Sequence, residues 1–266
     1  LIISAQDELG FLTTYEYDSI GRATQVNFAD GSHIGYTYNQ DRLESKIDQL
    51  GNVTHYELDN ANRLRKVIDP MGNITEVVYD DNGQIIRQKD AENHSVLFTY
   101  RADGRLLSKT DPAGLVTTYE YDGAGNVIAE TTLGRTTRYT YDAIGNLTSI
   151  TNALNNTTRY EYDSYGNLTR IIDPLNHDLR YTYDALNRVI TKSNALGETD
   201  HFAYDIVGNL TQVTDSIGRV VTNTFDSRNR LLRSDQPGGV NVKYTYDLAG
   251  NTTGITDIQN RTTSYF

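Results

Sequence analysis

The sequence predicts an all-β protein made of repeated antiparallel β-hairpins that together form a curved strip. Three observations lead to this fold class. An aromatic motif recurs every 20 or 21 residues, turns rich in Gly and Asn separate the copies, and the segments between turns are rich in Tyr, Thr, Val and Ile. The sequence has no helical period of useful length, and no apolar run approaches the roughly 18 residues of a membrane span.

A residue that is usually aromatic and stands before a recurring Asp defines the repeat. It falls at Tyr17, Tyr38, Leu58, Tyr79, Tyr100, Tyr121, Tyr141, Tyr162, Tyr183, Tyr204, Phe225 and Tyr246, which gives twelve copies. A second aromatic residue usually stands two places earlier, as in the segment "YTYD" at residues 139–142. Because side chains alternate along a strand, Tyr-x-Tyr predicts two rings on one face, which we expect to be the buried or lumenal face.

Two kinds of turn alternate along the chain. In the first, Asp follows the aromatic residue, and Gly or Asn three residues later supplies the left-handed backbone that a tight hairpin needs. The copy at Tyr38 lacks one turn residue, so its turn should differ. The second kind reads Asp-Pro-x-Gly, as at residues 111–114. Each repeat is therefore expected to hold two short strands, and Gly145→Val should damage its hairpin.

The best-formed copies supply the candidate structural signature. It comprises Tyr119, Tyr121, Asp122, Gly125, Tyr139, Tyr141, Asp142, Gly145, Tyr160, Tyr162, Asp163, Gly166, Tyr181, Tyr183 and Asp184. Aromatic pairs across neighbouring strands contribute roughly 0.2–1 kcal/mol each, so these columns are expected to hold neighbouring hairpins together.

Composition limits the classes of protein to consider. Hydrophobic residues make up only 37 % of the chain, so a compact aliphatic core is not expected. The net charge of −11 and the scattered basic residues make nucleic acid a poor partner. The absence of cysteine excludes disulfides and thiolate metal sites. Residues 1–266 are expected to form a single array of about twelve repeats that is cut within a repeat at both ends, without a separate toxin or autoprotease domain.

Candidate sites of other kinds have simpler explanations in the repeat. The five histidines, His33, His55, His94, His177 and His201, occupy different repeat positions and form no catalytic or metal-binding motif, so we expect no enzyme. One Asp per turn supplies too few oxygen ligands for calcium, so no metal or cofactor is expected. Asn-x-Thr sequons at Asn52, Asn73, Asn146, Asn167 and Asn209 arise because the turn ends in Asn and the next strand takes Thr.

The columns Y-x-Y-D-x-x-G-R/N-L, followed by D-P-x-G, closely resemble the Rhs or YD repeat over essentially the whole chain. This family includes bacterial Rhs polymorphic toxins, insecticidal toxin-complex cocoon proteins and animal teneurins. The resemblance implies β-hairpins that extend one strip, which spirals into a hollow β-shell. In bacterial members the shell encloses a C-terminal toxin domain, and a core segment often cleaves itself.

The resemblance therefore implies a structural role and a secreted or cell-surface location. The chain is expected to be a segment of a shell that encapsulates and helps deliver a C-terminal toxin or effector. Its partners would be neighbouring YD repeats, the enclosed cargo domain and a secretion-system component. An alternative is a cell-surface adhesion or carbohydrate-binding repeat module, because rows of tyrosines can stack on sugars, with glycans as partners.

Overall fold

The structure is a computed structural model that describes residues 1–7 and 10–265. Regular structure in these residues consists of β-strands and one short 3-10 turn, η1 (Pro237–Gly239). They divide into two units, which are described separately. Unit 1 holds Leu1–Glu120 and Glu130–Gly134, and unit 2 holds Tyr121–Ala129 and the described residues from Arg135 on. Strand β13 (Val127–Thr132) is divided between the two units, and the last residue of β12, Tyr121, also belongs to unit 2.

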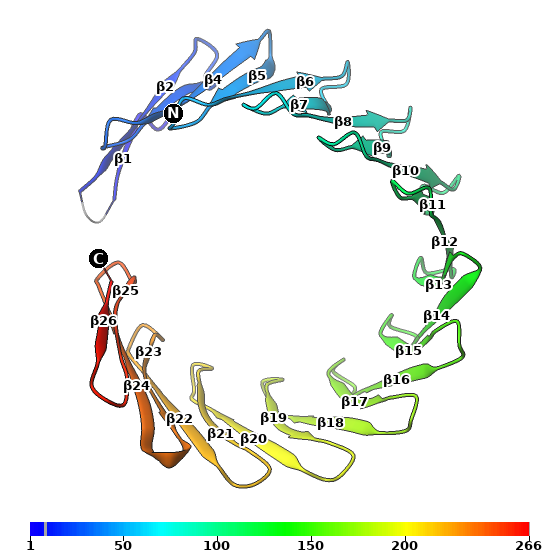
Figure 1. Ribbon diagram of the computed structural model, residues 1–266, viewed down its shortest axis with the longest axis vertical. Coiled ribbons are helices and arrows are strands. Elements are labelled where there is room, and N and C mark those ends of the chain that lie inside the picture. Colours follow the sequence, from blue (N-terminus) through cyan, green and yellow to red (C-terminus); the bar gives the residue numbers. More distant parts are fainter. Residues whose placement is uncertain (8–9, 266) are drawn as a thin grey trace. The chain divides into compact units, whose positions relative to one another are not determined.

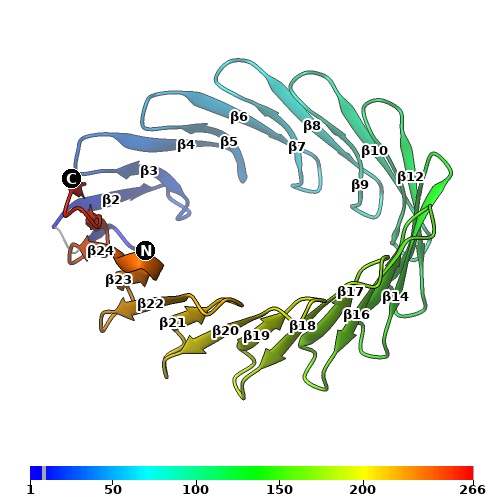
Figure 2. The same cartoon turned by 60° about the horizontal axis from the view of Figure 1, so that its bottom comes forward.

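Unit 1 is an antiparallel meander in which each strand pairs with the next along the chain. Its strands are β1 (Ser4–Gln6), β2 (Leu12–Tyr17), β3 (Ala23–Asn27), β4 (His33–Asn39), β5 (Arg42–Ile47), β6 (Val53–Leu58), β7 (Leu64–Ile68), β8 (Ile74–Tyr79), β9 (Ile85–Lys89), β10 (Ser95–Tyr100), β11 (Leu106–Thr110) and β12 (Val116–Tyr121). Within the unit, the strands follow one another along a curved path (Figure 1). Successive turns project alternately from the two edges of the strip (Figure 2).

Unit 2 has the same organisation. Its further strands are β14 (Arg135–Tyr141), β15 (Leu147–Thr151), β16 (Thr157–Tyr162), β17 (Leu168–Ile172), β18 (Asp178–Tyr183), β19 (Val189–Ser193), β20 (Thr199–Tyr204), β21 (Leu210–Thr214), β22 (Val220–Phe225), β23 (Leu231–Gln236), β24 (Val240–Tyr246), β25 (Thr252–Thr256) and β26 (Thr262–Ser264). The predicted all-β fold of antiparallel hairpins is confirmed, with two strands in each 20- or 21-residue repeat.

Among the hairpins whose register is described, those closed by the first kind of turn contain a β-bulge at the last residue of their first strand, which is usually the second aromatic residue. In the pair β14 and β15, Thr140 lies opposite Ser149, but Tyr141 lies opposite Leu147, so Thr148 has no partner of its own. The same irregularity recurs in the equivalent pairs of both units. A bulge increases local twist and bends the strand, so the repeat places one bend at the same edge of every hairpin.

Neither unit has a hydrophobic core. Among the described residues, Ala129 is the buried hydrophobic residue, and no large side chain is fully buried. Burial alternates along the Tyr-x-Tyr segments of strands such as β16 and β18, as that pattern predicts: Tyr160 and Tyr162 are half-buried, whereas Arg159 and Glu161 are exposed on the other face. The strip is one sheet thick, so its stability depends on contacts between neighbouring strands. In the described part of the chain, no helix is long and apolar enough to cross a membrane.

Candidate functional site between successive repeats

Each Asp turn is closed by its own aspartate. The Oδ1 atom of Asp142 accepts the backbone N–H groups of Ile144 (3.0 Å) and Asn146 (2.9 Å), while Gly145 N–H donates to the carbonyl of Asp142 (3.2 Å). Gly145 has φ +92°, the left-handed conformation that the sequence predicts. The turn is therefore held by bonds within five residues and needs no outside partner.

The other signature turns repeat this arrangement. Gly125 and Gly166 have φ +97° and +84°, and Asn187 takes the same place with φ +59°. The side-chain amide of Asn167 donates to Asp163 Oδ2 (3.0 Å) and, with backbone N–H groups, holds the pKa of that carboxyl below its usual value. The amide of Asn126 does the same for Asp122. For Asp184, the backbone N–H of Arg188 is the main cause of the lowered pKa. These aspartates are therefore ionised and engaged by the turn itself.

The copy at Tyr38 has a shorter turn, as expected from its missing residue. Strand β4 continues to Asn39 and β5 begins at Arg42, which leaves only Gln40 and Asp41 between them. Gln40 takes a positive φ of 55°. The turn is thus a two-residue hairpin connection in place of the Asp-closed loop.

In most repeats the second tyrosine bonds to the preceding repeat, a contact that the sequence did not predict. The hydroxyl of Tyr162 donates to the carbonyl of Leu147 at 3.0 Å. Backbone pairing between β15 and β16 covers only Ser149–Thr151 and Thr157–Arg159, so the hydroxyl reaches a carbonyl beyond the end of the ladder. The equivalent bonds join Tyr141 to Val127, Tyr183 to Leu168 and Tyr246 to Leu231, and Tyr17, Tyr38, Tyr79 and Tyr100 in unit 1 donate in the same way.

One repeat replaces this hydroxyl with a different donor. Phe225 occupies the second aromatic position and has no hydroxyl. Two residues earlier, where other copies carry an aromatic ring, Asn223 donates its side-chain amide to the carbonyl of Leu210 at 3.0 Å. Leu210 is the first residue of β21, the position that Leu147 holds in β15. Two departures from the repeat pattern therefore compensate each other.

Arginine after the left-handed residue adds a second link to the next repeat. The Nε atom of Arg188 donates to Asp184 Oδ2 (2.7 Å), and a terminal nitrogen donates to the carbonyl of Asp205 (2.9 Å). Its guanidinium lies over the ring of Tyr204, 4.7 Å from the ring centre. Such cation–π contacts contribute about 0.5–1 kcal/mol at exposed sites. Arg22, Arg63 and Arg230 make the same stacking contact.

The signature tyrosines of the first aromatic column lie within strands. Tyr139 and Tyr160 lie opposite Ile150 and Ile171, and Tyr181 lies opposite Lys192. Tyr119 lies within β12, and Tyr121 of the second column is the last residue of that strand. Burial raises the pKa of both Tyr162 and Tyr183, with smaller contributions from nearby Tyr and Asp side chains. At the junctions between repeats, the second-column residues Tyr141, Tyr162 and Tyr183 are thus bonded to the preceding repeat. The first-column residues Tyr139, Tyr160 and Tyr181 lie opposite residues of the paired strand.

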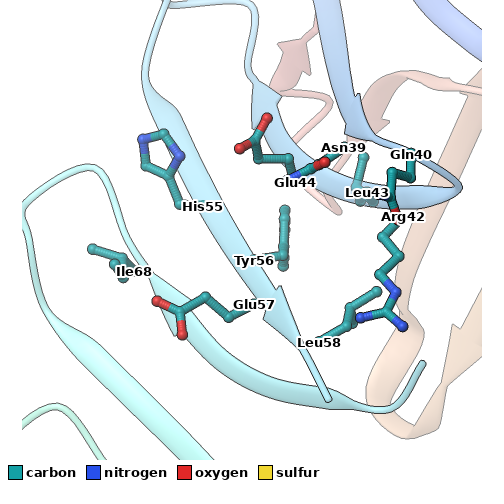
Figure 3. Close-up of a pocket in the computed structure, with 10 residues that line it drawn as sticks. All are labelled: Asn39, Gln40, Arg42, Leu43, Glu44, His55, Tyr56, Glu57, Leu58 and Ile68. Carbon is teal, nitrogen blue, oxygen red and sulfur yellow. The ribbon is translucent and has the colours of Figure 1, made fainter. Parts of the chain in front are cut away.

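A groove of about 520 Å³ lies beside the shortened turn in unit 1 (Figure 3). Glu44 of β5 and His55 and Glu57 of β6 line it and are exposed. Glu57 pairs with Lys66 at 2.9 Å, and no hydrogen bond or ion pair found among the described residues joins His55 to either glutamate. The groove therefore brings ionisable groups to one open surface without assembling a nucleophile and base.

One group of possible metal-binding side chains was found in the described residues. Asp90, Glu92 and His94 belong to a single exposed turn, and their ligand atoms lie within 4.8 Å of one another. The His94 ring contacts Asp90 at 3.2 Å, and His177 makes the equivalent contact with Asp173 at 2.9 Å. Each histidine stands four residues after the Asp of its turn, and this position brings its ring to the Asp carboxylate.

Comparison with solved structures identifies the fold. The structure titled "Crystal Structure of TcdB2-TccC3" matches with a TM-score of 0.60 and 16 % sequence identity over 95 % of this chain. The structures titled "Crystal Structure of TcdB2-TccC3-TEV" and "Crystal Structure of TcdB2-TccC3 without hypervariable C-terminal region" match with TM-scores of 0.57 and 0.53, over 95 % and 93 % of this chain, each at 16 % identity. The chain spans only 18 % of the length of each of these solved chains. No curated protein sequence matches it.

The sequence model of one protein family also matches. The family is described as Teneurin YD-shell, and the match runs over residues 73–239, more than half of the chain. This range includes all the signature residues and the turns and tyrosine junctions around them. The recurring Tyr, Asp and Gly positions, the antiparallel hairpins and the family match agree, and the chain belongs to the teneurin YD-shell family.

Proposed function

We propose that this chain is a wall segment of a YD-repeat β-shell that encapsulates a C-terminal toxin or effector domain of its parent protein and helps deliver it. The role is structural, and the parent protein is secreted or displayed at the cell surface. The partners are neighbouring YD repeats, the enclosed domain and a component of the secretion route.

The main observation behind this proposal is a strip of strands that lacks a core of buried apolar side chains in its described residues. A globular domain buries large apolar side chains, whereas the described residues of this chain bury none fully. Stability comes from junctions between neighbouring repeats, as in other repeat arrays, so the strip can be extended without a central core. A thin wall of this kind encloses volume with few residues, which suits a container.

The tyrosine junctions favour a wall over a sugar-binding module. Sugars stack on open aromatic faces, but the second-column rings are half-buried, and their hydroxyls are bonded to the preceding repeat. Where Arg follows the turn, its guanidinium also covers the ring, as Arg188 covers Tyr204. These rings are engaged in holding the repeats together.

Limited proteolysis of the complete parent protein tests the proposal. Mass spectrometry would follow the segment after the repeats, and the same segment expressed alone would serve as control. We expect the segment to survive in the parent until the repeats unfold, while the isolated segment is digested at the same protease concentration. Immediate digestion of the segment in the parent, with the repeats intact, would contradict the proposal that the repeats enclose it. A glycan-panel binding assay would then be the next measurement.

A further inference from the structure

The residue that follows the left-handed position of the Asp turn is Arg in some repeats and Asn in others. Where it is Arg, its side chain lies between its own turn and the next. Arg188 donates to Asp184 Oδ2 (2.7 Å) and to the carbonyl of Asp205 (2.9 Å), and its guanidinium lies over the ring of Tyr204. Arg230 makes the equivalent contacts with the repeat that follows it. The guanidinium thus occupies a site made of a carboxylate, a carbonyl and an aromatic face.

Two repeats that carry Asn have an open groove in the same place. Asn167 and Asn209 each line a groove of about 430 Å³ between their own turn and the next. The two grooves, which we call the Asn grooves, are equivalent and lie two repeats apart along the chain. Tyr183 lines the first and Phe225 the second, each in the position that Tyr204 holds beneath Arg188. Neither groove has an arginine among its lining residues, so these rings line it without a guanidinium over them.

A pair of asparagine side chains joins the two turns at each Asn groove. The amide of Asn167 donates to Asn187 Oδ1 at 2.9 Å, and the amide of Asn209 donates to Asn229 Oδ1 at 3.1 Å. In both cases the acceptor is the left-handed residue of the next turn. These short side chains bridge the turns and leave the space that the longer arginine fills elsewhere.

The Asn grooves carry negative charge without a matching cation. Asp163 and Asp205 accept the neutral side-chain amides of their own turns at 3.0 and 2.8 Å, and no ion pair to either carboxylate was found in the described part of the chain. By contrast, Arg188 pairs with the Asp184 carboxylate at 2.7 Å. Neither groove has Lys, Arg or His among its lining residues. A ligand with a positive charge is therefore favoured, and the net charge of −11 acts in the same direction.

We propose that the Asn grooves bind arginine side chains of a partner polypeptide, each guanidinium taking the place that Arg188 fills within this chain. In the first groove the guanidinium stacks on Tyr183 and donates to the carbonyl of Asp184. In the second, Phe225 and Asp226 hold the same places. A planar guanidinium can stack on a ring and donate in its own plane at the same time, which a lysine ammonium cannot do. This binding site is separate from the wall role and does not depend on it.

The distance between the Asn grooves indicates how the arginines are spaced in the partner. The grooves lie four strands apart in unit 2, which corresponds to about 19 Å at the usual distance between strands. An extended chain advances about 3.3 Å per residue, so two arginines about six residues apart reach both grooves. The partner is therefore an extended basic segment with arginines at this spacing.

A fluorescently labelled peptide of Gly and Ser that carries two arginines at this spacing tests the inference. Fluorescence anisotropy at low ionic strength should show saturable binding to the 266-residue chain. The same peptide with citrulline in place of arginine keeps the shape of the side chain but loses its charge. It should bind at least about fivefold more weakly, because the cation–π attraction is lost at two grooves. The peptide with lysine should also bind more weakly, since it lacks the planar stacking group.

Replacement of the groove asparagines supplies the matched variants. The double variant Asn167→Arg and Asn209→Arg should fill both grooves from within the chain, as Arg188 does in its own repeat, and abolish binding of the arginine peptide. The double variant Asn146→Arg and Asn251→Arg changes the net charge equally at the same turn position of other repeats, and should bind as the wild type does. Thermal melts followed by circular dichroism check that both variants remain folded.

Several results would overturn the inference. One is a wild-type chain that does not bind the arginine peptide. Equal binding of the citrulline or lysine peptide would show that no guanidinium site exists, whether or not the variants fold. Undiminished binding by the folded variant with Asn167→Arg and Asn209→Arg would place the peptide elsewhere. An equal loss of binding in the variant with Asn146→Arg and Asn251→Arg would assign the attraction to overall charge.

Discussion

Removal of the Tyr162 hydroxyl tests whether bonds between repeats stabilise the strip. Tyr162→Phe keeps the ring and its packing but deletes the 3.0 Å hydrogen bond to the carbonyl of Leu147. A hydrogen bond of this kind contributes about 0.5–1.5 kcal/mol net, and leaving a partly buried carbonyl unpaired adds to the loss. We therefore expect the junction between β15 and β16 to lose about 1 kcal/mol.

The assay has to resolve one junction from the others. Repeat arrays are stabilised by nearest-neighbour contacts, so a local loss need not appear as a uniform shift of the whole melt. Native-state hydrogen exchange measured by mass spectrometry reports local opening. A loss of about 1 kcal/mol corresponds to roughly fivefold faster exchange for amides at this junction, while peptides in unit 1 should be unchanged.

Tyr165→Phe provides the matched control. Tyr165 is 82 % exposed at a turn tip and lies outside the two aromatic columns, so removal of its hydroxyl should leave exchange unchanged. Equal exchange in the two variants would refute the reasoning, because it would mean that the Tyr162 hydroxyl is as well satisfied by water as by Leu147. Equal acceleration in distant peptides would also refute it, by showing that the array unfolds as one unit.

Three further predictions concern other parts of the repeat. Asn223→Ala should lower the free energy of unfolding by about 1 kcal/mol because it leaves the carbonyl of Leu210 without its donor. Adding Phe225→Tyr should recover this stability, as measured by chemical denaturation. Gly145→Val should lower stability by at least about 1–2 kcal/mol through backbone strain alone, since no atom lies within 4 Å of the added Cβ. Gly145→Asn should cost clearly less stability, because Asn tolerates the left-handed conformation. Equal losses in the two variants would exclude backbone strain as the cause. The turn carboxyls have lowered pKa values, so their contribution to stability should be complete above the ordinary Asp pKa of about 3.9 and decline as the pH falls below it; a melting temperature unchanged between pH 5 and pH 3 would contradict this.

The fold could be predicted from the sequence because the repeat places local signals in a fixed order. Gly145 and Asn187 stand where a left-handed residue is required, and Tyr-x-Tyr sets the alternation of faces. These are properties of a few adjacent residues, so twelve copies in one sequence suffice to reveal them.

The tyrosine junction could not be predicted in the same way. The bond from Tyr162 to Leu147 depends on where backbone pairing ends and on the bulge beside Tyr141, neither of which is visible in residue type. The nearly constant offset of 14 or 15 residues between the two partners is a usable signal in retrospect, but it has no meaning until the strands are paired.

The tyrosine bonds also bear on how such a chain folds. Each links residues only 14 or 15 positions apart, and the arginine links span 17 or 18, so contact order stays low however many repeats are joined. Folding rates fall as contact order rises, which penalises most all-β proteins. Here a nascent chain needs only one completed hairpin to provide the template for the next. A wall of this design can therefore be assembled as it leaves the ribosome, at a rate set by synthesis and independent of its final length.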